Sequence, residues 1–168
     1  MKKIMIVDDN YLSAEGIEKN IDWETLNAEI IHVCYNGTSA IEAMKKEPAD
    51  LIISDIEMPD LDGISMSRQA LEINPMVKII LISAYDKFEY ARRALLLGAL
   101  DYIEKPLDYA YLIQKVKNAF ALMEKEQKNL QLLKQSRPLL TEKFFREITH
   151  LPSSEAAYRL KPYLQYLN

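Results

Sequence analysis

Short apolar runs alternate with helix-like amphipathic segments from residue 3 to residue 104. The apolar runs predict five strands, at residues 3–7, 29–35, 51–54, 77–83 and 100–104. The segments between them predict four helices, at residues 11–21, 38–46, 64–73 and 86–98. The first, third and fourth strands are almost wholly apolar, as strands covered on both faces must be. The pattern therefore predicts an α/β fold, a doubly wound five-stranded parallel sheet with helices on both faces.

A last helical pattern begins near residue 109 and is expected to continue to about Arg137, where Pro138 interrupts it. Its apolar positions recur at spacings of four and three, with Glu126 and Arg137 as defects. These positions are Val116, Ala119, Met123, Leu130, Leu133 and Leu140. Such a spacing fits a coiled-coil seam and favours a homodimer. The alternative is one amphipathic helix that folds back on its own domain.

The chain accordingly divides into three predicted parts. Residues 1–125 form the α/β domain, and residues 126–137 continue its last helix as the predicted coiled coil. Residues 138–168 are expected to be the helical start of a linker or middle domain, with a short amphipathic helix at 141–149. About 30 residues are too few for a core of their own.

The composition narrows the function classes. The chain has 168 residues, 49% of them hydrophobic, and a net charge of −4, with no basic stripe typical of nucleic-acid binding. No apolar run has the length of a membrane span, and no signal peptide opens the sequence. Cys34 is the only cysteine, which fits a reducing cytoplasm and a position in the core. We therefore expect a cytoplasmic protein without membrane contacts.

Charged and polar residues follow the predicted strands where each one ends. Asp8 and Asp9 follow the first strand, Asp55 the third, Ser83 the fourth and Lys105 the fifth. Ligands of open α/β sheets bind outside the carboxyl ends of the strands, so these side chains are expected to converge. Three adjacent carboxylates repel one another and favour a hard cation with oxygen ligands, which is Mg²⁺ where phosphate is also present.

The same set of residues predicts phosphoryl chemistry. The carboxylate of Asp55 can attack a phosphorus atom and form an acyl phosphate. Lys105 and the metal ion would neutralise charge on the transferring group, and Ser83 would donate a hydrogen bond to it.

These residues stand in motifs that resemble the receiver domain of two-component response regulators, over roughly residues 1–125. The motifs are Asp8-Asp9, Ser54-Asp55-Ile56-Glu57-Met58-Pro59 with Asp62-Gly63, Ser83-Ala84-Tyr85, and Asp101-Tyr102 before Lys105-Pro106. The resemblance implies a flavodoxin-like strand order 2-1-3-4-5 and a cis peptide bond before Pro106. It also implies that Asp55 accepts a phosphoryl group from a sensor histidine kinase.

The resemblance further implies a role for each residue of the site. Asp9, Asp55 and the backbone carbonyl of Glu57 would bind Mg²⁺ directly, and Asp8 would bind it through water. Lys105 would pair with the phosphoryl group. Ser83 and Tyr102 would form the switch pair that reshapes the face built from the helix at 86–98, the strand at 100–104 and the last helix.

A narrower resemblance links the chain to receivers that carry an AraC-type helix-turn-helix output domain. It rests on Ile21-Asp22-Trp23-Glu24, on residues 85–91 and on residues 141–147. No such domain is present in these 168 residues, so DNA contact is expected only through a domain outside this chain. The implied function is a signalling switch that controls transcription, with weak self-phosphorylation and autodephosphorylation but no enzymatic purpose.

Other residues near the site have lesser predicted roles. Ala84 is small enough to leave room for a phosphoryl group, and Tyr85 is hypothesised to restrict water and slow hydrolysis. Asp60 and Asp62 are interpreted as ordinary loop residues, and Asp101 as a surface carboxylate.

Three other functions compete with the switch. A hydrolase with an aspartyl nucleophile would need an aspartate where Glu57 stands, and a flavin protein would need a Ser/Thr/Gly-rich loop where Asp8 and Asp9 stand. The third is a receiver fold that is never phosphorylated and serves only in interaction or dimerisation. The acidic residues and Lys105 argue against it, but the sequence leaves it open.

Overall fold

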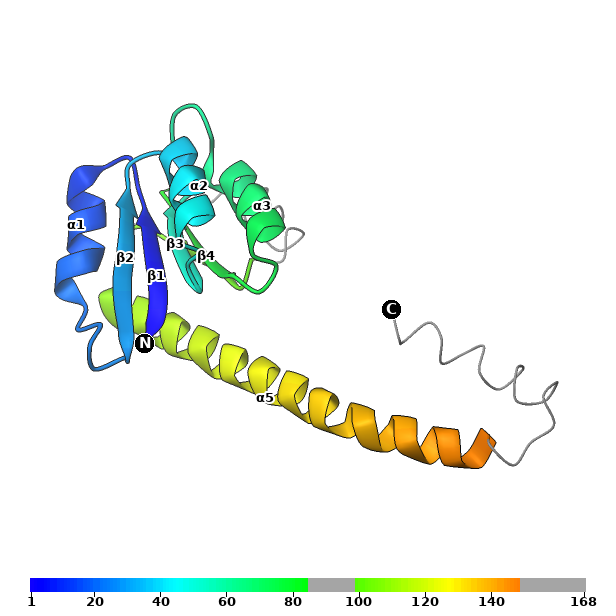
Figure 1. The fold of residues 1–168 in the computed structure, drawn as a ribbon. Coiled ribbons are helices and arrows are strands. Elements are labelled where there is room, and N and C mark those ends of the chain that lie inside the picture. Colours follow the sequence, from blue (N-terminus) through cyan, green and yellow to red (C-terminus); the bar gives the residue numbers. More distant parts are fainter. Residues whose placement is uncertain (85–98, 149–168) are drawn as a thin grey trace. The chain divides into compact units, whose positions relative to one another are not determined.

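The computed structural model describes residues 1–84 and 99–148, with side chains up to residue 132 (Figure 1). The elements follow one another as β1 (Lys2–Val7), α1 (Tyr11–Asn20), β2 (Ala28–Cys34), α2 (Gly37–Lys46), β3 (Leu51–Asp55), α3 (Gly63–Ile73), β4 (Lys78–Ser83), β5 (Asp101–Glu104) and α5 (Tyr109–Ile148). The predicted helix at 86–98 and the stretch from residue 149 lie outside the described residues.

The five strands form one sheet in the order β2-β1-β3-β4-β5, and every neighbouring pair is parallel. The fold class and strand order predicted from the sequence are confirmed. The register pairs Val7 with Ser54, and Asp55 with Ile82. The carboxyl ends of β1, β3 and β4 therefore lie side by side, where the predicted site requires them.

Side-chain caps fix where three helices begin. The side chains of Asn10, Asn36 and Asp62 accept hydrogen bonds from backbone N–H groups in the first turns of α1, α2 and α3. Such caps satisfy donors that a helix leaves unpaired at its first turn, and they stabilise it by about 1 kcal/mol. Asp62 is therefore more than an ordinary loop residue, because it starts α3.

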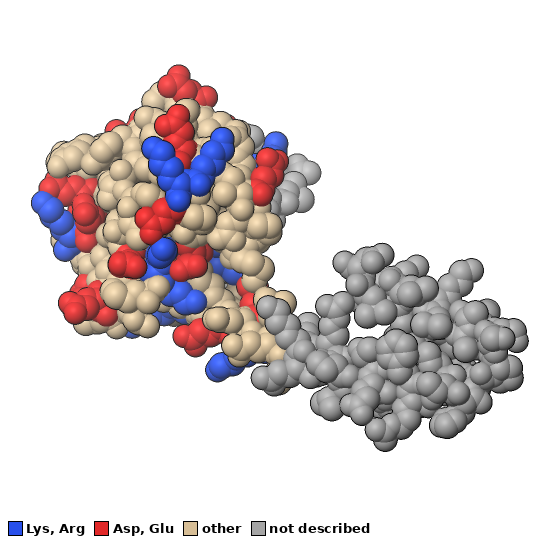
Figure 2. Space-filling model, viewed as in Figure 1, with Lys and Arg blue, Asp and Glu red and all other residues tan. Residues whose placement is uncertain are grey.

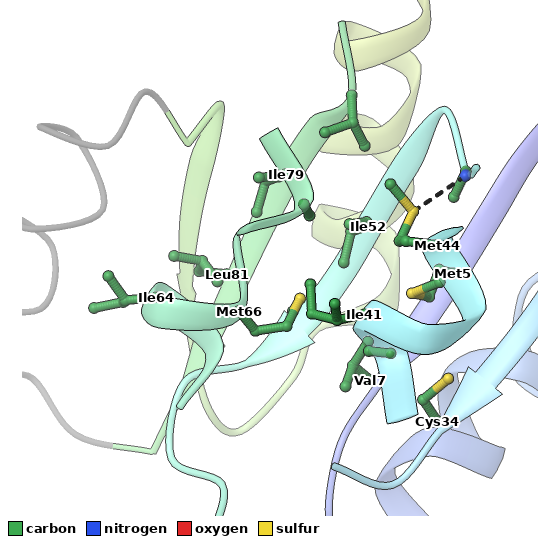
Figure 3. Close-up of a cluster of buried hydrophobic side chains, with 14 of the residues drawn as sticks. Met5, Val7, Cys34, Ile41, Met44, Ile52, Ile64, Met66, Ile79 and Leu81 are labelled. Carbon is green, nitrogen blue, oxygen red and sulfur yellow. Dashed lines mark hydrogen bonds between the residues drawn. The ribbon is translucent and has the colours of Figure 1, made fainter. Parts of the chain in front are cut away.

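The strands β1, β3 and β4 are buried on both faces, and their alternate residues point to opposite sides of the sheet. On one side, residues of β1, β3 and β4 pack with α2 and α3, which lie next to each other (Figures 1 and 3). This core cluster includes Met5, Val7, Ile52, Ile79 and Leu81 from the strands, and Ile41, Met44, Ile64 and Met66 from the helices. Cys34 also belongs to the core cluster, as predicted.

One sulfur atom in the core cluster carries a polar contact. The Sδ atom of Met44 accepts a hydrogen bond of 3.2 Å from the backbone N–H of Ala49 (Figure 3). Both residues are fully buried, so no water can replace this acceptor.

We expect Met44→Leu to lower the free energy of unfolding by about 1 kcal/mol more than Met66→Leu does. Leucine keeps most of the volume but leaves the Ala49 N–H without an acceptor. Met66 is a matched control, because it is equally buried in the same core cluster. Urea denaturation of the two variants measures the difference, and equal losses would show that the sulfur contact adds nothing.

The prediction that Pro138 ends the last helix is wrong, because α5 continues to Ile148. The backbone angle of proline suits a helix. Inside a helix, proline removes one hydrogen bond and its ring crowds the carbonyl four residues earlier, which can kink a helix without ending it. The residues before it, 128–137, are mostly leucine, lysine, arginine and glutamine, which favour helix up to the proline. The separate helix predicted at 141–149 is likewise part of α5 up to Ile148.

The predicted seam along α5 is buried at its start. Val116 and Ala119 are fully buried in the single chain, together with Leu112 and nearly all of Phe120, so these positions are not free for a second helix. Leu130 and Leu132 are exposed. For residues 112–120 the helix thus packs on its own domain, whereas the coiled coil remains a prediction for the later part of α5.

Candidate functional site

The four strand ends bring the predicted residues to one edge of the sheet. Asp55 and Ser83 are the last residues of β3 and β4, Asp8 directly follows β1, and Lys105 directly follows β5. The peptide bond between Lys105 and Pro106 is cis, as the resemblance implied. The backbone N–H of Lys105 donates to the carbonyl of Ser83 over 2.8 Å, which ties the end of β5 to the end of β4.

The ammonium group of Lys105 binds two of the carboxylates. Its Nζ atom lies 2.6 Å from Oδ2 of Asp55 and 3.2 Å from Oδ2 of Asp8. Asp8 and Asp55 are buried, and Lys105 is about a quarter exposed. The remaining oxygens also have donors, because Oδ1 of Asp8 accepts from the backbone N–H of Asn10 and Oδ1 of Asp55 from that of Glu57.

Burial and charge act in opposite directions at this site. Burial raises the pKa of the Asp8 carboxyl, and the Asn10 N–H and the Lys105 charge only partly offset this. Burial also disfavours the charge on Lys105, but hydrogen bonding and attraction from Asp55 outweigh it and raise the pKa of the ammonium. Lys105 is therefore a cation at neutral pH, and it is well placed to neutralise negative charge on a group bound to Asp55.

The acidic residues can hold a metal ion. One carboxylate oxygen each from Asp8, Asp9 and Asp55 lie within 4.8 Å of one another, and Asp9 is exposed at the rim. Three carboxylates against one lysine leave an excess of negative charge. Hard oxygen ligands with partial access to solvent fit Mg²⁺, which keeps several of its own waters.

The predicted switch residues lie on neighbouring strands. Ser83 at the end of β4 is fully buried. Tyr102 on β5 is half-buried, pairs in register with Leu81 of β4, and its side chain packs against the core cluster. Ala84 is exposed at the rim, whereas Tyr85 lies outside the described residues. The acidic group, Lys105 and Ser83 are thus brought to one edge, and Tyr102 lies on the strand that leads to it.

The chain matches the model of the response regulator receiver domain over residues 4–117. It belongs to this family. Two relatives are transcriptional regulatory proteins: YesN of Bacillus subtilis, 29% identical over 126 residues, and HptR of Staphylococcus aureus, 30% identical over 112 residues. The alignments cover 75% and 67% of this chain but only 34% and 44% of those proteins. The chain thus spans less than half the length of the curated relatives it matches.

Three solved structures resemble this receiver. The receiver domain of AraT from Geobacillus stearothermophilus is 34% identical, with a TM-score of 0.71 over 75% of this chain and 98% of that one. A two-component transcriptional regulator AraC from Clostridium phytofermentans is 30% identical, with a TM-score of 0.68 over 77% and 99%. A chain of the CheX–CheY–BeF₃–Mg²⁺ complex from Borrelia burgdorferi is 29% identical, with a TM-score of 0.65 over 71% and 89%.

Sequence reasoning missed Gly63 as a residue that shapes the site. It begins α3, and its N–H donates to the carbonyl of Ile56 over 2.9 Å. A Cβ atom at this position would overlap the carbonyl oxygen of Asp55. Only glycine lets α3 approach the backbone of Asp55 so closely. The feature of the sequence that could have indicated this is the glycine directly after Asp62, in the loop that follows Asp55.

The surface of this receiver carries mixed charge. On the face seen in Figure 2, the described lysine and arginine side chains lie among aspartate and glutamate rather than gathering into one patch. Among residues 1–84 and 99–148, no helix is long and apolar enough to cross a membrane.

We expect Lys105→Met to bind Mg²⁺ about tenfold more tightly than the unaltered receiver, because a positive charge that competes for Asp55 and Asp8 is removed. Isothermal titration calorimetry measures this affinity. Lys115→Met is a matched control, because it removes an equal charge whose partner, Asp101, is not one of the acidic residues at the site. An unchanged affinity in Lys105→Met would mean that lysine and metal do not compete.

Proposed function

We propose that this receiver is a phosphorylation-dependent signalling switch that accepts a phosphoryl group from a sensor histidine kinase on Asp55. The observation that carries the proposal is the pairing of a buried Asp55 carboxylate with Lys105 beside further carboxylates. A nucleophile, a cation for the phosphoryl oxygens and ligands for Mg²⁺ are thereby held within a few ångströms of one another. The comparison with a complex that contains BeF₃ and Mg²⁺ supports the same chemistry.

In the proposed transfer, a carboxylate oxygen of Asp55 forms a bond to phosphorus while the bond from phosphorus to the donor's histidine nitrogen breaks. The Lys105 ammonium neutralises charge on the phosphoryl oxygens, and Ser83 donates a hydrogen bond to one of them. Asp9, Asp55 and the Glu57 carbonyl would hold Mg²⁺, with Asp8 acting through water, and the ion would supply further charge neutralisation. Slow attack by water returns the carboxylate, so turnover is weak and incidental.

The switch follows from the charge that phosphorylation adds, about −1.5 to −2 at neutral pH. Ser83 moves to bind the phosphoryl group, Tyr102 enters the space released, and the face that includes β5 and α5 changes shape. The proposed result is a change in self-association along α5. In a longer protein of the kind represented by YesN and HptR, this change would act on a DNA-binding output domain.

The test is to add beryllium fluoride, which mimics a bound phosphoryl group, together with Mg²⁺ and to follow amide chemical shifts and light scattering. We expect shifts at Asp9, Ser83, Tyr102 and Lys105, and a rise in apparent mass. Shifts without any change in mass would support the switch but contradict dimerisation as its output. If none of these amides responds, the receiver acts as an unphosphorylated interaction or dimerisation module.

A further inference from the structure

The carboxylate of Asp101, at the start of β5, makes two contacts in different directions. Its Oδ1 atom accepts a hydrogen bond of 3.0 Å from the backbone N–H of Tyr102. Its Oδ2 atom lies 2.6 Å from the Nζ atom of Lys115 on α5. Both side chains are largely shielded, with 26% of Asp101 and 21% of Lys115 exposed. The surface carboxylate predicted from the sequence is therefore a bridge between a strand and a helix.

Lys115 is held by its own helix as well. Its Nζ atom lies 4.8 Å from the centre of the Tyr111 ring, one turn earlier in α5, which is a favourable position for a cation. Hydrogen bonding to Asp101 and to Tyr111 raises the pKa of Lys115, so the ammonium is charged at neutral pH. Leu112 and Val116, on the same turns, are fully buried and anchor this part of α5 in the domain.

The strand β5 also leads directly to the candidate phosphorylation site. It has four residues, Asp101 to Glu104, and Lys105 follows it. Lys105 contacts Asp55 through its side chain and Ser83 through its backbone N–H. β5 is thus connected to Asp55 through Lys105 at one end, and to Lys115 on α5 through Asp101 at the other.

We propose that the Asp101–Lys115 ion pair is a positioning pair that couples Tyr102 and β5 to α5. The inference rests on the proposed function, because it requires Tyr102 to change position when Asp55 is phosphorylated. A carboxylate bound to both the Tyr102 amide and the Lys115 ammonium makes the helix follow the strand in direction and distance. The apolar contacts beneath α5 hold the helix on the domain but are non-directional, whereas the ion pair joins one named atom of β5 to one of α5.

The test compares Lys115→Met, which removes the ammonium but keeps the apolar stem, with Lys115→Arg, which keeps the charge. Glu47→Gln is the control, because it removes the carboxylate charge from the Lys3–Glu47 pair of 2.8 Å in another part of the domain. Each 168-residue chain is titrated with beryllium fluoride and Mg²⁺, and amide shifts are followed at the site and at residues 112–119 of α5.

In Lys115→Met we expect a full response at Asp9 and Lys105, while the response of residues 112–119 falls by about half or more. Lys115→Arg and Glu47→Gln should respond as the unaltered receiver does. Asp101→Asn is a second variant that keeps an oxygen for the Tyr102 N–H but loses the charge, and it decides the question if Lys115→Met does not fold.

Three results would overturn the coupling while leaving phosphorylation intact. The first is an unchanged shift response of α5 in the variants that break the pair. The second is an unaltered receiver in which the site amides shift while those of α5 do not. The third is a Lys115→Met chain whose α5 amides already have, before titration, the chemical shifts of the beryllium fluoride-bound receiver. A failure of the proposed function looks different, because then the site amides of the unaltered receiver do not respond at all.

Discussion

Asp55→Asn is expected to abolish both phosphorylation of this receiver and its response to beryllium fluoride. Asparagine has nearly the same shape, but its amide oxygen carries no full negative charge and cannot become the oxygen of an acyl phosphate. One of the carboxylates available for a metal is lost as well. The fold should persist, because Lys105 keeps its contact of 3.2 Å with Asp8.

The measurement is incorporation of labelled phosphate from a histidine kinase or a small phosphodonor, followed by amide shifts with beryllium fluoride and Mg²⁺. Asp62→Asn is the matched control in the same loop. It makes the same chemical change and keeps a side-chain oxygen to cap α3, so labelling should be unaffected. Persistent labelling of Asp55→Asn would place the phosphoacceptor elsewhere and end the proposed mechanism.

The sequence was a good guide to this site because the chemistry is distributed over strand ends. Buried parallel strands are short apolar runs with clear ends, and the residue after each run lies at the same edge of the sheet. The sequence therefore predicted that Asp8, Asp55, Ser83 and Lys105 lie together at this edge. Their convergence depends on topology, and the strand order confirms that topology.

Features that depend on tertiary packing could not be predicted in the same way. The pairing of Asp101 with Lys115 joins a strand to a helix and leaves no periodic signal in the sequence. The spacing of Val116 and Ala119 predicted part of a coiled-coil seam, but both residues are buried in their own domain. A helix that packs on its own domain shows the same spacing of apolar residues, so the sequence could not separate the two arrangements. Pro138 was expected to end the last helix, yet α5 continues past it, because proline can kink a helix without ending it.

Gly63→Ala is expected to lower the free energy of unfolding by about 3 kcal/mol, at the upper end for an added methyl group in a packed region. The new Cβ atom would overlap the Asp55 carbonyl oxygen and lie 3.0 Å from the Asp55 carbonyl carbon and from Cα of Ile56. All of these are backbone atoms of a buried strand end and its loop, so a side-chain rotation cannot relieve the clash. Either α3 or the backbone at Asp55 must move.

Gly16→Ala is the matched control, since it adds the same methyl group at a second crowded glycine. Its Cβ atom would lie 2.5 Å from the hydroxyl oxygen of Tyr109, which is the far end of a side chain that can shift. Alanine also favours the interior of α1 by about 0.5–1 kcal/mol relative to glycine. Gly16→Ala should therefore stay within about 1 kcal/mol of the unaltered receiver, because the helical gain offsets part of the clash.

Urea denaturation measures both stabilities, and calorimetric titration with Mg²⁺ separates a local effect from a global one. Because displacement of the Asp55 backbone also moves the neighbouring Glu57 carbonyl, Gly63→Ala should weaken Mg²⁺ binding under conditions where the chain is still folded, whereas Gly16→Ala should not. Equal stability and equal Mg²⁺ affinity in the two variants would mean that the approach of α3 to Asp55 does not shape the site. A loss of stability and of Mg²⁺ affinity in Gly63→Ala alone would show that this glycine keeps the loop after Asp55 in place beside the acidic residues.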